Sequence, residues 1–186
     1  MGESLVSNID QLVESMLDDV RREIEAGGDY AVYGHSMGAL VGYLICHKLF
    51  ALDLRMPTRL IVSGKKAPSV KHGSGISHLK DDLFWQEVTK MGGIPDGLLC
   101  HSELTTFFCP ILKADFEAIE SYEHRPASSL GIPIDVFYGT ADANKDDMTG
   151  WVTESESQVT INEMSGGHFF IFDHIEFFQN YFTNIT

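Results

Sequence analysis

The chain has 186 residues, 44 % of them hydrophobic, which is enough for one domain with a buried core. Its formal net charge of −14 argues against nucleic acid as a partner, and no apolar run is long enough to predict a transmembrane helix. Three cysteines without metal-like spacing, and an N-terminus without an apolar signal-peptide core, favour a cytoplasmic protein with reduced thiols.

Helix and strand signals alternate along the first third of the chain. Residues 7–26 place apolar side chains at helical spacing and stop at Gly27-Gly28, which predicts an amphipathic helix. Residues 30–33 predict a short buried strand, and residues 37–50 predict a helix that is apolar on all sides. Residues 58–63 predict the next strand. This order is typical of an α/β fold with a mostly parallel sheet and helices on both faces.

The chain then changes character over residues 71–129, which have helical periodicity, many aromatic residues and no strand signal. Strands are predicted again at residues 132–138 and 158–164, and a final helix at 173–182. An insertion of about 60 residues is too long for one crossover between strands, so we interpret it as a helical cap within a single domain, 1–186. Ordinary crossover helices are the alternative interpretation.

The segment Gly34-His35-Ser36-Met37-Gly38 lies between a predicted strand and a predicted helix. This is the context of a nucleophile elbow, in which the serine hydroxyl is held above the sheet. We expect a strained backbone at Ser36 and collisions for any side chain at positions 34 or 38. Met37 would begin the helix, and its backbone N–H could help stabilise an oxyanion. A purely structural strand-to-helix turn is the alternative.

Two later loops carry the partners that a serine nucleophile needs. Asp142 follows the strand at 132–138 and His168 follows the strand at 158–164, each at a carboxyl end. The order Ser36, Asp142, His168 is the order of an α/β-hydrolase triad of nucleophile, acid and base. We interpret two aspartates farther along the acid loop, and the histidine that supports the elbow, as non-catalytic: Asp146, Asp147 and His35. Neither zinc-like spacing nor a phosphate-binding glycine loop is present, so no metal and no cofactor are expected.

With these motifs, nearly the whole chain resembles type II (editing) thioesterases of non-ribosomal peptide and polyketide synthesis, in the α/β-hydrolase superfamily. Beyond the elbow, the resembling segments are Gly139-Thr140-Ala141-Asp142, Gly167-His168, His78-Leu79-Lys80-Asp81-Asp82-Leu83-Phe84, Met91-Gly92-Gly93-Ile94-Pro95 and Pro110-Ile111-Leu112-Lys113-Ala114-Asp115-Phe116. Lys80 replaces a proline of the family's pattern and Lys113 replaces an arginine.

The resemblance implies hydrolysis of acyl groups from the phosphopantetheine thiol of carrier proteins. Ser36 would be the nucleophile, His168 the base and Asp142 the acid that orients the base. Family members also have N-terminal strands and a loop that supplies a second oxyanion donor. The sequence has no segment that resembles them, so we expect an N-terminally truncated member of the fold. The sheet edge beside the elbow strand would then be open to self-association.

A basic stretch stands out against the acidic chain. Residues 55–80 hold six of the 13 Lys and Arg residues and no acidic residue. Because carrier domains of this family's partners are acidic, we expect Lys65, Lys66 and Lys71 to dock one; a merely solvated loop is the alternative. Two other functions stay open: a carboxylic ester hydrolase on the same fold, and a catalytically impaired fragment that only binds acyl carriers.

Overall fold

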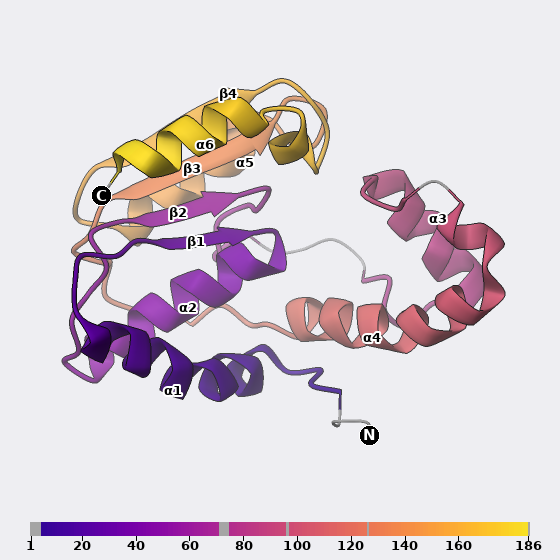
Figure 1. Ribbon diagram of the computed structural model, residues 1–186, viewed down its shortest axis with the longest axis horizontal. Coiled ribbons are helices and arrows are strands. Elements are labelled where there is room, and N and C mark those ends of the chain that lie inside the picture. The colour runs from indigo at the N-terminus through magenta and orange to yellow at the C-terminus, as the bar shows by residue number, and fades with distance from the viewer. Residues whose placement is uncertain (1–4, 71–74, 96, 126, 186) are drawn as a thin grey trace. The chain divides into compact units, whose positions relative to one another are not determined.

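The computed structural model describes residues 5–70, 75–95, 97–125 and 127–185 (Figure 1). The chain divides into two compact units. The sheet unit consists of Val13–Val70 and His124–Thr186, and the helical unit consists of Met1–Leu12 and Lys71–Glu123. The predicted insertion, 71–129, thus covers nearly the same residues as the larger segment of the helical unit.

Within the described residues, the sheet unit contains four parallel strands, which agrees with the predicted mostly parallel sheet, and their order is β1-β2-β3-β4. Their bounds are Val32–His35, Leu60–Ser63, Ile134–Gly139 and Val159–Met164. The first strand lies two residues later than the predicted 30–33. Gly34 and His35, which the motif assigned to the turn, are paired with Val62 and Ser63 and so belong to the strand.

Helices cover both faces of the sheet (Figure 1). Helix α2 (Met37–Ala51) packs closely on one face, where a side chain at Gly42 would come within 3.0 Å of Val32. Helix α1 (Ile9–Ala26) lies beside it, and Glu14 of α1 forms an ion pair with Lys48 of α2. Helix α6 (Ile175–Asn184) covers the opposite face through an aromatic core: Ile61, Phe137, Phe170 and Phe178.

Strand β1 forms an edge of this sheet. Within the part of the chain that the structure describes, β2 is its only partner strand, and Tyr33 of β1 is 39 % exposed. The self-association expected of such an edge stays a prediction. No helix in the described residues combines the length and the hydrophobicity needed to span a membrane.

The helical unit is built from α3 (Asp81–Met91), the short turn η1 (Leu98–Cys100) and α4 (Ser102–Glu120). Its core contains the buried side chains Phe84, Val88 and Cys109. Lys113 donates to the Leu79 carbonyl at 2.6 Å and to Asp81 at 2.7 Å, which ties α4 to the start of α3. The described residues of this unit contain no strand, in agreement with the helical pattern. Its role as a cap stays a prediction.

Candidate active site

The elbow between β1 and α2 has the strained backbone that the motif predicts. Ser36 has a φ of 54° and a ψ of −117°, a conformation that costs a non-glycine residue about 1–3 kcal/mol. A side chain at Gly34 would lie 2.0 Å from the Gly38 carbonyl oxygen, so position 34 requires glycine. The same expectation for Gly38 is wrong, because a Cβ there would have no neighbour within 4 Å. Gly38 matters through its backbone, which Gly34 approaches.

Ser36 and His168 lie within hydrogen-bond distance, and so do His168 and Asp142. His168 Nε2 is 3.0 Å from Ser36 Oγ, and His168 Nδ1 is 2.9 Å from Asp142 Oδ2. A carboxylate can only accept, so Nδ1–H donates to Asp142, and Nε2 is free to accept the serine proton. The side chains of His168 and Asp142 are 17 % and 25 % exposed. The three residues proposed from chain order thus meet in one arrangement, 132 residues of sequence separating the serine from the histidine.

The loops after β3 and β4 hold this arrangement by backbone contacts. Ala141 N–H donates to the Gly166 carbonyl at 2.8 Å. A side chain at Gly139 would lie 2.3 Å from the Gly167 carbonyl oxygen, so glycine lets the acid loop approach the histidine loop. This close approach places Asp142 beside His168.

Asp147, which also lies in the acid loop, has different surroundings from Asp142. The Asp147 side chain accepts from the backbone N–H of Asn144 at 3.3 Å, and its own N–H donates to Asn144, which forms a capping box for the short helix α5 (Lys145–Met148). Asp147 also forms an ion pair with Lys66 at 2.9 Å. Hydrogen bonds from Lys66 and Asn144 lower the pKa of Asp147. These contacts explain the exclusion of Asp147 from the triad.

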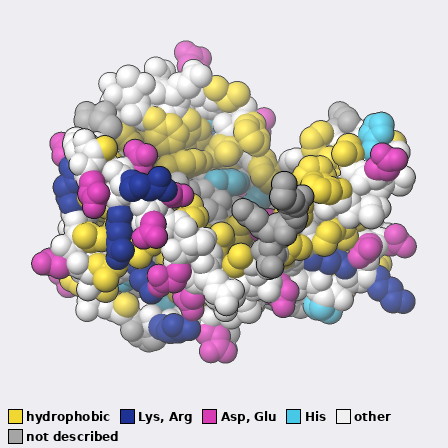
Figure 2. Space-filling view, turned by 60° about the horizontal axis from the view of Figure 1, so that its bottom comes forward, with side chains coloured by type: hydrophobic (Ala, Val, Ile, Leu, Met, Phe, Trp, Pro, Cys, Tyr) yellow, Lys and Arg dark blue, Asp and Glu magenta, His cyan; other side chains and the backbone are white. Residues whose placement is uncertain are grey.

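The predicted docking residues differ in their surroundings. Lys65 is only 8 % exposed, and burial lowers its pKa to about 8. Its assignment to a docking surface is therefore wrong. The loop that carries Lys65 packs inward, and the Lys65 carbonyl accepts a hydrogen bond from the Trp151 indole at 2.9 Å. Lys66 is half-buried and paired with Asp147, and Lys71 lies outside the described residues. On the face shown in Figure 2, basic side chains lie among acidic ones rather than in a separate patch.

The remaining polar groups give little support to a different chemistry. All three cysteines are free, and burial raises the pKa of Cys46 to about 12, which makes its thiol a poor nucleophile. Among the described residues, no group of three or more His, Cys, Asp and Glu side chains could hold a metal ion. Met37 begins α2, so its N–H is one of the helix's first donors without an intrahelical acceptor. Its role toward an oxyanion stays a prediction.

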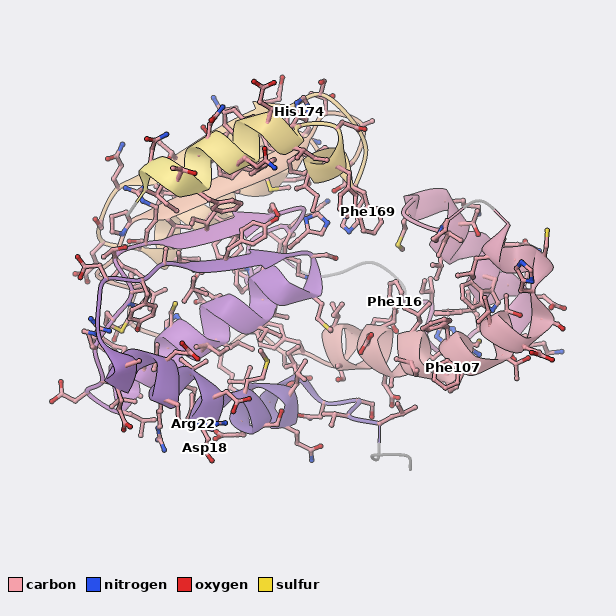
Figure 3. All side chains as sticks on the ribbon, in the orientation of Figure 1. Asp18, Arg22, Phe107, Phe116, Phe169 and His174 are labelled. Carbon is pink, nitrogen blue, oxygen red and sulfur yellow. The ribbon has the colours of Figure 1, made fainter. Side chains whose placement is uncertain are left out.

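Sequence reasoning missed two neighbours of His168. His35 lies beside it, with ring centroids 5.1 Å apart, and is hydrogen-bonded through Nδ1 to Ser63 Oγ at 2.9 Å. Phe169 packs edge-on against His168, with centroids 5.0 Å apart, and lies at the carboxyl-end edge of the sheet (Figure 3). The register of β1 and β2 places His35 opposite Ser63, and the loop after β4 then brings His168 beside its ring.

Acidification is expected to destabilise the fold through His35. Burial, and next the neighbouring His168, lower the pKa of His35 from 6.5 to about 4. Between these values the unfolded chain binds a proton that the folded chain does not, so the free energy of unfolding falls as the pH falls. We expect the melting temperature to decrease from pH 6.5 to pH 4, and to decrease less in His35→Phe. Circular dichroism melts would measure this, and an equal pH dependence in both proteins would contradict it.

Comparison with known proteins identifies related chains. A family model described as Thioesterase domain matches residues 1–184. The chain is 28 % identical to the gramicidin S biosynthesis protein GrsT of Aneurinibacillus migulanus, covering 90 % of this chain and 66 % of that protein. It is 31 % identical to the thioesterase PikA5 of Streptomyces venezuelae, covering 78 % and 53 %.

A solved structure shows the same fold. YbtT, a type II thioesterase from the yersiniabactin NRPS/PKS biosynthetic pathway, matches with a TM-score of 0.83 at 30 % identity. The match covers 94 % of this chain and 72 % of YbtT. The chain spans 66 % or less of the length of the two curated relatives above.

Proposed function

The chain belongs to the thioesterase family, and from that premise we propose that it hydrolyses acyl groups from the phosphopantetheine thiol of carrier proteins. The biosynthetic setting would be non-ribosomal peptide or polyketide synthesis, the setting named for YbtT. Removal of an unwanted acyl group from a stalled carrier would be an editing reaction. The observation that carries the proposal is the hydrogen-bonded chain from Ser36 through His168 to Asp142.

The proposed reaction has two halves. Ser36 Oγ attacks the thioester carbonyl carbon while its proton passes to His168 Nε2, and Asp142 stabilises the imidazolium. The Met37 N–H, at the positive end of α2, stabilises the oxyanion of the tetrahedral intermediate. The intermediate breaks its C–S bond, His168 returns the proton to the pantetheine thiolate, and an acyl ester remains on Ser36. Water, activated by His168, then releases the carboxylic acid.

A direct experiment compares substrates and proteins. An acyl-pantetheine thioester and its matched oxygen ester are offered to this chain and to Ser36→Ala. We expect the chain to release the thiol at a rate that Ser36→Ala does not reach. The elbow chemistry is common to thioesterases and carboxylic ester hydrolases, so the preferred substrate decides between them. Faster hydrolysis of the oxygen ester would favour the carboxylic ester hydrolase. Equal rates for the chain and Ser36→Ala would favour the fragment that only binds acyl carriers, and would contradict the proposal.

A substitution at Lys66 tests whether the basic stretch docks an acidic carrier. We expect Lys66→Glu to raise the KM for an acyl group on an acidic carrier by up to about tenfold, because one exposed charge pair contributes roughly 1 kcal/mol or less. Hydrolysis of a small acyl-pantetheine thioester should change little.

Lys48→Glu is the matched control for this substitution. Lys48 also forms an ion pair, with Glu14, and its side chain is as exposed as that of Lys66, 42 %. It should leave both substrates unaffected. An equal loss on both substrates in Lys66→Glu would mean that the substitution disturbs the acid loop through Asp147 rather than carrier docking.

A further inference from the structure

His35 is anchored on one side by the Ser63 hydroxyl, which is in turn hydrogen-bonded to Tyr33. The register of β1 and β2 sets His35 opposite Ser63, and their side chains are hydrogen-bonded at 2.9 Å. The Tyr33 hydroxyl lies 3.0 Å from the same Ser63 oxygen. Ser63 is completely buried, so this oxygen is a fixed point of the sheet rather than a mobile surface group. The imidazole of His35 is therefore held in one orientation.

On its other side the same ring contacts the candidate base. The ring centroids of His35 and His168 are 5.1 Å apart, and that of Phe169, labelled in Figure 3, is 5.6 Å from His35. A Cβ added to Gly64 would lie 2.7 Å from His35 Cε1 and 3.4 Å from His168 Cε1. The two histidines and the Gly64 backbone thus share one tightly filled space. A shift of the His35 ring would leave His168 without support on that side.

The environment of His35 keeps it uncharged. Its Nε2 is buried and has no hydrogen-bond partner among the described residues. A proton added there would be unsolvated and would lie next to His168, and these effects lower the pKa of His35 to about 4. At neutral pH the ring is a neutral spacer. It does not oppose the positive charge that His168 acquires when it accepts the serine proton.

We propose that His35 is a positioning residue, fixed by Ser63 and Tyr33, that holds the His168 ring with Nε2 toward Ser36 and Nδ1 toward Asp142. The inference rests on the role of His168 as base in the proposed function. It requires no contact between His35 and the substrate. It differs from the role of turn support that the sequence suggested, because the ring acts on the base rather than on the elbow backbone.

The test measures how fast a fluorophosphonate labels Ser36, a reaction that needs the serine–histidine pair but no carrier and no thioester. We expect His35→Ala to slow labelling by about 10- to 100-fold, because small displacements of reacting groups cost rates of this order. Water reaching His168 should also move the midpoint of the pH–rate profile upward. Ser63→Ala, which keeps the His35 ring, should slow labelling by a smaller factor. The double variant should be no slower than His35→Ala, because both act through one chain of contacts.

His47→Ala is the matched control. His47 is also half-buried, also has a buried Nε2 without a partner among the described residues, and packs against Tyr43 rather than His168. It should lower the melting temperature but leave the labelling rate and the pH midpoint unchanged. Equal slowing in His47→Ala, or wild-type labelling and an unchanged midpoint in both His35→Ala and Ser63→Ala, would overturn the proposal.

The outcome separates this proposal from the proposed function. A chain that hydrolyses no thioester, yet labels at Ser36 at a rate that depends on His35, would retain the positioning role and contradict the thioesterase activity. Absence of Ser36 labelling in the unmodified chain would overturn the positioning role itself, since no activated pair would exist to be positioned.

Discussion

Replacing Ser36 by alanine is expected to reduce thioester hydrolysis by a factor of about 10⁴ or more. The serine oxygen is the atom that forms the acyl ester in the proposed reaction, and it lies 3.0 Å from His168 Nε2. Removing one member of such a unit costs nearly as much as removing all of it, because the members act together. The substitution should not unfold the protein, because among the described residues the Ser36 hydroxyl makes one hydrogen bond, to His168. The measurement is kcat for thiol release from an acyl-pantetheine.

Ser129→Ala is a suitable control for this variant. Ser129 is a half-buried serine of the same unit whose hydroxyl donates to the Thr153 carbonyl at 3.0 Å. Its kcat should equal that of the unmodified chain. A Ser36→Ala variant that keeps more than a tenth of the activity would identify a different nucleophile.

The second large effect is expected for Asp142→Asn, with a loss of about 10⁴ in kcat. Asparagine has nearly the same shape, but its amide group can donate to His168 Nδ1. The imidazole proton would then lie on Nε2, the atom that must accept the proton of Ser36. The KM should change much less than kcat, because Asp142 contacts the base rather than the acyl chain. Steady-state kinetics on one thioester separates the two constants.

Asp146→Asn tests whether the loss is specific to that position. Asp146 lies in the same loop and also carries a carboxylate, but it lies farther than Asp142 from the end of β3. We expect Asp146→Asn to retain most of the activity. The opposite ranking of the two variants would contradict the assignment of Asp142.

Much of the sheet and the candidate site follows from local sequence patterns. Each of Ser36, Asp142 and His168 lies within four residues of the end of a strand, and parallel strands bring their carboxyl ends to one edge. The order of the three residues then identifies their pairing, and the glycine at position 34 is explained by the backbone of Gly38 alone. These features depend on where the strands lie along the chain and on one tight turn, both of which leave clear signals in a single sequence.

The features that were missed depend on register and packing between distant segments. The contact of His35 with Ser63 requires that β1 and β2 pair in one register, which no pattern within either strand determines. Lys65 has the polarity of a surface residue, yet its loop packs against Trp151, 86 residues away in the chain. The short helix α5 and its capping box at Asn144 are too brief to produce a periodic pattern.

Mass spectrometry of the acyl-enzyme tests the central claim most directly. The chain is mixed with a carrier protein that bears an acyl-phosphopantetheine arm, quenched in acid within the first turnovers, and digested. We expect the mass of the acyl group on the peptide that contains Ser36, and no such mass on the corresponding peptide of Ser36→Ala. An acyl group on another peptide would contradict the assignment of Ser36 as the nucleophile. So would hydrolysis of the substrate with no acylated Ser36 peptide in either the unmodified chain or Asp142→Asn.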